Sequence, residues 1–139
     1  IGDRSRFSDK VKAALNRIES NTAHGQTMTL ILALNYSSRS EIVVAVRDLA
    51  EKVASGELKA EQIDEQMISS ALYTAQIPDP DLIIRTSGEC RLSNFLMWQA
   101  SYSEFYFTDV LWPDFDEAEL DKAIESYRTR DRRFGGVKK

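Results

Sequence analysis

Short apolar segments that alternate with longer amphipathic ones constrain the fold of this chain most. Residues 28–35 (MTLILALN) are apolar and partly β-branched, and residues 81–85 and 105–107 are two further strand candidates. Apolar runs of this length are typical of buried strands, and strands that alternate with helices favour a parallel sheet. We therefore predict an α/β fold in which a parallel sheet is flanked by helices. Because three short strands make a thin sheet, we expect the sheet to be incomplete in this chain.

Helices are predicted where apolar residues recur at the spacing of one helical face. They span residues 8–24, 40–55, 60–73 and 93–100, and the last helix begins at residue 116. Ser8, Ser40 and Asp116 are predicted N-caps, because a short polar side chain there accepts a hydrogen bond from an unpaired backbone N–H. Ser93 or Asn94 is expected to cap the short helix that ends at residue 100.

The apolar faces of these helices are expected to point into the core. Val43, Val46 and Leu49 lie on this face of the second helix, and Leu120, Ala123 and Ile124 lie on that of the last one. A chain of 139 residues buries enough surface for such a core without disulfides or structural metal. No internal repeat divides the sequence, so we expect one continuous domain over residues 1–139.

The charges are unevenly distributed along the chain. The formal net charge of −4 argues against a general affinity for nucleic acid. Residues 109–125 nevertheless hold seven acidic side chains and one basic one, whereas residues 128–139 hold six basic side chains and one acidic one. One interpretation is a helix whose acidic start and basic end match its dipole. The other is a basic tail that meets a polyanionic ligand.

Reactive residue types are sparse. Cys90 is the only cysteine, which excludes a disulfide framework and a multi-cysteine zinc site. The only histidine, His24, lies at a predicted helix end, where a surface or dipole-pairing role is expected. Arg39 follows the first predicted strand and either joins an anion pocket or braces the neighbouring loops; we favour bracing.

The loop after the strand at residues 81–85 carries the clearest chemical signal. Arg85 ends this strand, Arg91 follows six residues later, and Ser93 is placed at a predicted helix start. Arginine forks match phosphate oxygens, and a helix N-terminus adds partial positive charge and free N–H groups. Ligands of parallel sheets bind at the carboxyl ends of strands, so a diphosphate site is one interpretation. In the alternative, Arg85 pairs with a nearby carboxylate and Ser93 only caps the helix.

Glu104 is the candidate metal ligand. It lies among aromatic residues beyond the loop, and Mg²⁺ is usually held by one or two carboxylates together with substrate phosphates. The alternative is a structural glutamate that pairs with Arg85 or Arg91. Glu89, inside the loop, has the same two interpretations, with less reason to favour metal.

Several motifs together resemble the cis-prenyltransferases, and within them the bacterial undecaprenyl diphosphate synthases (isoprenyl transferases). The most specific block is residues 81–89 (DLIIRTSGE) followed by residues 91–95 (RLSNF). The other matching segments are residues 1–7, 35–39, 98–104, 112–115 and 132–135. The resemblance therefore runs nearly end to end.

The resemblance implies a homodimeric enzyme that uses Mg²⁺ to add isopentenyl diphosphate units, with cis double bonds, to an allylic diphosphate such as farnesyl diphosphate. Its product would be undecaprenyl diphosphate, the precursor of a cell-wall (peptidoglycan) lipid carrier. By motif, Arg85, Arg91 and Ser93 would hold isopentenyl diphosphate, and Glu104 would help to bind Mg²⁺. Gly135, in the basic tail, would reach the diphosphate of the neighbouring subunit. Residues 28–34 would line the tunnel for the growing chain.

Two departures from the family pattern bear on activity. Tyr36-Ser37-Ser38-Arg39 stands where the family has Tyr-Gly-Gly-Arg, so this turn is expected to differ in shape. The Asp-Gly-Asn-Gly-Arg-Trp segment, which carries the family's catalytic aspartate, is not in this sequence. We therefore expect the chain to be the C-terminal portion of a single cis-prenyltransferase domain that is inactive by itself, with the catalytic aspartate upstream.

Two other functions compete with this interpretation. One is a non-catalytic partner subunit of a cis-prenyltransferase, and the other, weaker one is an unrelated Mg²⁺-dependent phosphoester hydrolase. For the enzyme we expect a cytoplasmic location, with peripheral membrane contact through the lipid product and no nucleic-acid partner.

Overall fold

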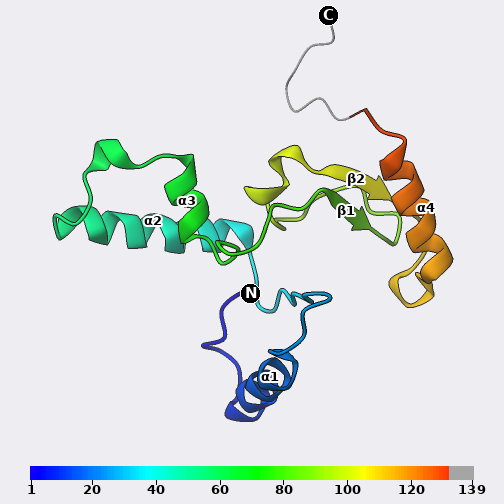
Figure 1. Ribbon diagram of the computed structural model, residues 1–139, viewed down its shortest axis with the longest axis horizontal. Helices are drawn as coiled ribbons and strands as arrows, with labels where there is room; N and C mark the ends of the chain where they lie inside the picture. The colour runs from blue at the N-terminus through cyan, green and yellow to red at the C-terminus, as the bar shows by residue number, and fades with distance from the viewer. Residues whose placement is uncertain (132–139) are drawn as a thin grey trace, which may run out of the picture. The chain divides into compact units, whose positions relative to one another are not determined.

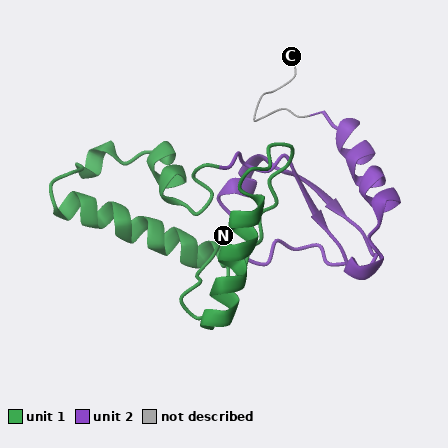
Figure 2. Cartoon of the chain, turned by 60° about the horizontal axis from the view of Figure 1, so that its bottom comes forward, with its two compact units in different colours: residues 1–76 green, residues 77–139 purple. Residues whose placement is uncertain are grey.

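The computed structural model describes residues 1–131 of the chain. It contains two compact units, Ile1–Gln76 and Ile77–Lys139, which Figure 2 shows in different colours. The first unit holds α1 (Asp9–Thr22), α2 (Ser38–Ala54), a 3-10 helix (Ala60–Gln62) and α3 (Glu65–Ala71). The second holds β1 (Leu82–Arg85), a 3-10 helix (Gln99–Tyr102), β2 (Glu104–Phe107), a 3-10 helix (Trp112–Asp114) and α4 (Glu117–Arg128).

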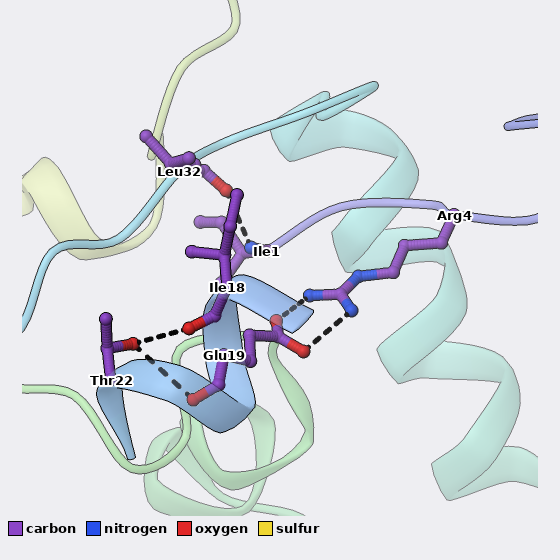
Figure 3. A network of polar contacts seen from close by, with 6 residues as sticks. All are labelled: Ile1, Arg4, Ile18, Glu19, Thr22 and Leu32. Carbon is purple, nitrogen blue, oxygen red and sulfur yellow. Dashed lines mark hydrogen bonds and ion pairs between the residues drawn. The ribbon is translucent and has the colours of Figure 1, made fainter. Parts of the chain in front are cut away.

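The first helix begins at its predicted cap, but none of its residues is buried. The Ser8 side chain accepts a hydrogen bond of 3.4 Å from the backbone N–H of Val11, which caps α1. The segment before α1 is fastened to it by an ion pair between the Arg4 guanidinium and the Glu19 carboxylate, drawn in Figure 3. The hydrogen bond from Arg4 is the main cause that lowers the pKa of Glu19.

The predicted strand at residues 28–35 is wrong for the described chain, because this segment is not a strand. Met28 is 81% exposed and Leu30 75% exposed, so the apolar run is not buried. Its end nevertheless pairs in parallel with the start of the chain: Ile1 N donates to Leu32 O at 2.8 Å, and Leu34 N donates to Ile1 O at 3.0 Å. Only this short stretch of backbone finds a strand-like partner, and apolar side chains alone do not make a strand.

The second helix begins earlier than predicted and buries only part of the predicted face, including Leu49. Its N-cap is Ser37, whose side chain accepts from the N–H of Ser40 at 3.5 Å, so Ser40 lies inside the helix. The buried residues of α2 are Ser38, Glu41, Ala45 and Leu49. Val43 is 48% exposed and Val46 52% exposed. The inner face is therefore the one that α3 covers, and the valines lie outside it.

The helix predicted over residues 60–73 is divided in two. A 3-10 helix covers Ala60–Gln62, and α3 starts after Asp64. Asp64 has an extended backbone (φ −125°, ψ 179°), and its side chain accepts from the N–H of Met67 at 2.8 Å. A capping residue in the middle of an apolar pattern thus ends one helix and begins the next.

The second unit is built on a parallel pair of strands, as predicted. The strands β1 and β2 lie side by side in Figure 1, with Leu82 opposite Glu104 and Arg85 opposite Phe107. The helix α4 contacts β2, and Asp116 caps it by accepting from the N–H of Glu119 at 3.0 Å. The prediction of an α/β fold with a parallel sheet and flanking helices is therefore confirmed. The sheet of the described residues has two strands, not three.

Two local predictions in this unit differ from the structure, one of them in part. Of the predicted inner face of α4, Ala123 is buried, whereas Leu120 and Ile124 are each 41% exposed. The short helix predicted over residues 93–100 does not form. Ser93 and Asn94 have φ angles of 50° and 63°, and such left-handed residues cannot continue a right-handed helix.

Candidate functional site

A cleft of about 340 Å³ lies at the carboxyl end of β1. Its walls come from one face of the strand pair and from the loop that follows β1; the side chains on it include Ile83, Arg85, Glu89, Arg91, Phe105 and Phe107. Partners in a parallel pair lie on the same face of the sheet, and Arg85 is opposite Phe107. The strand pairing therefore places a basic side chain beside an aromatic wall.

The cation that ends β1 is available to a ligand. Arg85 is half-buried and lines the cleft, and its backbone carbonyl accepts from the N–H of Thr108 at 3.0 Å, which extends the strand pairing. Among residues 1–131, no carboxylate forms a salt bridge with this guanidinium. The alternative in which a described carboxylate neutralises Arg85 is therefore not realised, and an incoming anion would meet an uncompensated charge.

The loop after β1 is held in place by backbone hydrogen bonds. Ser87 and Gly88 have φ angles of 68° and 70°, two consecutive left-handed residues. Their N–H groups donate to the carbonyls of Val110 at 2.8 Å and Thr108 at 2.9 Å. Both N–H groups are therefore already used within the protein and are not free donors for a phosphate. These two hydrogen bonds fix the loop beside the cleft to the residues that follow β2.

The second predicted arginine reaches the same cleft with a partner. Arg91 forms an ion pair with Glu89, and their side chains are 65% and 37% exposed. An exposed pair of this kind is worth about 0–1 kcal/mol, so an anion can replace the carboxylate at little cost. The structure therefore brings Arg85 and Arg91 together, with Arg91 the less available cation.

Ser93 does not take the predicted position. It is exposed, has a left-handed backbone and is not at the start of a helix. It also does not line the cleft that holds the two arginines. The predicted gain from a helix N-terminus is therefore missing at this site. Gly135, the other predicted substrate contact, lies outside the described residues.

The aromatic wall of the cleft was not anticipated from the sequence. The rings of Phe105 and Phe107 stack with centroids 5.9 Å apart and planes 11° apart. The signal in the sequence is their spacing of two, which places both on one face of a strand. The cleft thus offers cations and apolar surface together, which suits an anion that carries a hydrocarbon group.

Glu104 lies away from this cleft. It is opposite Leu82 at the amino end of the strand pair, and strand alternation puts it on the other face from Arg85. Its Oε2 accepts a hydrogen bond of 2.8 Å from Nη1 of Arg130, so its partner is neither Arg85 nor Arg91. Within residues 1–131, no three His, Cys, Asp or Glu side chains gather as a metal site. One carboxylate fits Mg²⁺ only together with substrate phosphates.

A buried carboxylate in the first unit escaped the sequence reasoning. Glu41 is 1% exposed and accepts hydrogen bonds from the hydroxyl of Tyr36 at 2.6 Å and from the N–H of Tyr73 at 2.8 Å. It joins the start of α2 to the segment after α3. A glutamate in the first turn of a helix is usually a solvated dipole partner, so the sequence held no signal for its burial.

No helix among residues 1–131 has the length and apolar character needed to cross a membrane.

Known proteins resemble the chain over almost all of its length. A family model described as "Putative undecaprenyl diphosphate synthase" matches residues 1–135. An isoprenyl transferase of Brucella abortus is 56% identical over 137 residues, which are 99% of this chain and 54% of that protein. The (2E,6E)-farnesyl-diphosphate-specific ditrans,polycis-undecaprenyl-diphosphate synthase of Escherichia coli is 48% identical, again over 99% of this chain and 54% of that protein.

A solved structure agrees with these relatives. The crystal structure of lavandulyl diphosphate synthase from Lavandula x intermedia, in complex with dimethylallyl diphosphate, superposes with a TM-score of 0.94 at 45% identity. It matches 97% of this chain and 58% of that chain. The chain spans about half the length of the curated relatives that it matches.

Proposed function

Because the chain belongs to the undecaprenyl diphosphate synthase family, we propose that its protein catalyses cis-prenyl chain elongation. In this reaction isopentenyl diphosphate condenses with an allylic diphosphate such as farnesyl diphosphate, and repeated additions give undecaprenyl diphosphate. Two relatives support this choice of substrate by name, one specific for farnesyl diphosphate and one crystallised with dimethylallyl diphosphate. The product would serve as the precursor of a peptidoglycan lipid carrier.

This chain would supply the site for isopentenyl diphosphate. The observation that supports the proposal is Arg85, a half-buried and uncompensated cation at the end of β1, beside an apolar wall. Its guanidinium would hold the diphosphate, Arg91 would turn from Glu89 to the same group, and the stacked rings would contact the isoprene unit. Ser93 and Gly135 remain proposed contacts from the family motif.

These residues would act by position and charge. Arginines fixed by a rigid loop hold the diphosphate at one end, which orients the reacting double bond toward the allylic partner. In the condensation the pyrophosphate leaves the allylic substrate, whereas the diphosphate that these arginines would hold stays on the product; their charge would therefore bind and orient isopentenyl diphosphate. Mg²⁺, when bound, would neutralise diphosphate charge outside this cleft; Glu104, on the other face of the strand pair from Arg85, remains its proposed carboxylate ligand from the family motif.

The assembly and location follow from the same proposal. We propose a homodimer in which Gly135 reaches the neighbouring subunit's diphosphate. We also propose a cytoplasmic protein that contacts membranes through its lipid product.

The test is steady-state kinetics of the full-length protein with Arg85→Ala and Arg91→Ala. A hydrogen bond to a charged group is worth about 1.5–3 kcal/mol, so Arg85→Ala should raise KM for isopentenyl diphosphate at least tenfold. Arg91→Ala should raise it less, because the wild-type arginine must first leave Glu89. Arg17→Ala, an exposed arginine of α1, is the matched control. Unchanged kinetics in both cleft variants would overturn the assignment.

The rival function, a non-catalytic partner subunit, makes a different prediction. The purified full-length protein would then synthesise polyprenyl diphosphate only after a second, different chain is added. By itself, the 139-residue chain is expected to show no turnover. Robust synthesis by this chain alone would contradict that expectation.

A further inference from the structure

A small aromatic patch lies on the surface just beyond the carboxyl end of β2. Leu111 is 57% exposed and Trp112 is 73% exposed, although both side chains are large and apolar. The Trp112 ring stacks on that of Phe115, with centroids 6.2 Å apart and planes 10° apart. The carbonyl of Val110 accepts from the N–H of Ser87, which lines the cleft. The aromatic patch (Leu111, Trp112 and Phe115) therefore borders the candidate site.

Four exposed carboxylates flank this patch in the sequence and form what we call its acidic rim: Asp109, Asp114, Asp116 and Glu117. Among residues 1–131, no lysine or arginine forms a salt bridge with any of the four. The dipole of α4 favours acidic residues at its start, but Asp109 and Asp114 precede the helix. The aromatic patch thus offers a partner exposed apolar surface together with negative charge that no described base neutralises.

We propose that the aromatic patch and its acidic rim dock residues 132–139 of a second copy of this chain. The inference rests on the proposed function, which includes a homodimer, and it names the surface that one subunit offers to the other. Charge complementarity supports this partner, because residues 132–139 hold four basic side chains, one phenylalanine and no acid. Arginine also binds the face of an exposed tryptophan ring, which an arginine-rich segment would find at Trp112.

The direction of α4 favours a second copy over the chain's own end. This helix has 12 residues, so it is about 18 Å long. Just after it ends, Nη1 of Arg130 lies 2.8 Å from Oε2 of Glu104, which is at the start of β2. The aromatic patch follows the other end of β2, so residues 132–139 begin at the far end of α4 from the patch of their own chain. In a two-fold dimer, each copy can offer its patch to the other, and no chain has to turn back along its own helix.

The first test identifies the neighbours of the basic segment. Isotope-labelled and unlabelled full-length proteins are mixed, and a carbodiimide couples lysines to adjoining carboxylates. Mass spectrometry should find Lys138 or Lys139 of one isotope joined to the acidic rim of the other. Joins within a single isotope alone would show that the patch takes the chain's own end, which would overturn the choice of a second copy. No join between these segments would overturn the whole proposal.

The second test measures the dissociation constant of the full-length dimer by sedimentation equilibrium. An exposed ion pair changes an affinity by up to about fivefold, so Asp109→Asn combined with Asp114→Asn should raise the constant about tenfold. Trp112→Ala should raise it as well, and added salt should reduce the effect of the two asparagines. The matched control is Asp9→Asn, an exposed acid in the first turn of α1, which should change nothing.

A double variant that dimerises as tightly as Asp9→Asn would overturn the proposal, as would a wild-type protein that stays monomeric. Circular dichroism of each variant checks that the fold is kept. Neither test uses a substrate, so a failure here is distinct from a failure of the proposed function, which KM for isopentenyl diphosphate tests through Arg85.

Discussion

Removal of the buried carboxylate at position 41 should destabilise the protein strongly. Glu41 is 1% exposed and accepts hydrogen bonds of 2.6 Å from the Tyr36 hydroxyl and 2.8 Å from the Tyr73 N–H. Each hydrogen bond to a charged group is worth about 1.5–3 kcal/mol, so loss of both gives about 3–6 kcal/mol. Glu41→Ala also leaves the Tyr73 N–H without this acceptor and a cavity where the buried side chain was. We therefore expect a loss at the upper part of that range.

Comparison of Glu41→Gln with Glu41→Ala separates the loss of the carboxylate charge from the loss of side-chain volume. Glu41→Gln keeps the size of the side chain but only one accepting oxygen, whereas both carboxylate oxygens accept in the wild type; it should cost about 1.5–3 kcal/mol, the worth of one charged hydrogen bond. Glu51→Ala, at an exposed position of the same helix, should change stability by no more than about 0.5 kcal/mol. The assay is urea denaturation of the full-length protein followed by far-ultraviolet circular dichroism. A Glu41→Ala variant as stable as Glu51→Ala would refute the reasoning.

Three further changes test the loop after β1 and the N-terminal ion pair. Gly88→Ala puts a methyl group on a backbone with φ of +70° and 3.0 Å from a carboxylate oxygen, so thermal melting should show a loss of about 1–2 kcal/mol. Glu89→Gln removes the competitor of Arg91 and should lower KM for isopentenyl diphosphate a few-fold, whereas a raised KM would count against the cleft. The Arg4 hydrogen bond lowers the pKa of Glu19, so this carboxylate stabilises the fold above its unfolded pKa and loses that effect as pH falls through its folded pKa. Arg4→Ala should raise the Glu19 pKa in an NMR titration, and an unchanged pKa would contradict the contact.

The sequence predicted two helix caps, because a cap depends only on neighbouring residues. Ser8 and Asp116 cap their helices because a cap needs only its own side chain and a backbone N–H three residues later. The strands at residues 82–85 and 104–107 formed because each provides the other with a partner.

Predictions failed where the outcome depends on a distant partner. Val43 and Val46 carry a plausible apolar face, yet the position of α3 decides which side of α2 is buried. The run at residues 28–35 has the composition of a buried strand but, among the residues that the structure describes, its backbone pairs only with residues 1–3. The helix predicted over residues 93–100 is absent for a different reason. Ser93 and Asn94 have left-handed backbone angles, which the spacing of apolar residues does not predict.

Some charged residues were predicted from the sequence and others were not, for the same reasons. Arg85 and Arg91 were predicted from their positions after a strand, and strand ends are placed by local pairing. Glu41 could not be predicted, because its burial depends on Tyr73, 32 residues further along the chain. Arg130 was likewise hidden among the basic residues at the end of the sequence, since its contact with Glu104 spans 26 residues.

The partners of the charged groups determine what a ligand can gain from each of them. Arg85 lies half-buried without a described counter-ion, so an anion there gains the full interaction and displaces no other group. Arg91 and Glu104 already have partners, so a ligand at either gains only the difference between the new interaction and the old one. A diphosphate, which carries more than one negative charge, can take Arg85 and still displace Glu89 from Arg91. A singly charged anion gains mainly at Arg85, and this difference would let the cleft select diphosphates over smaller anions.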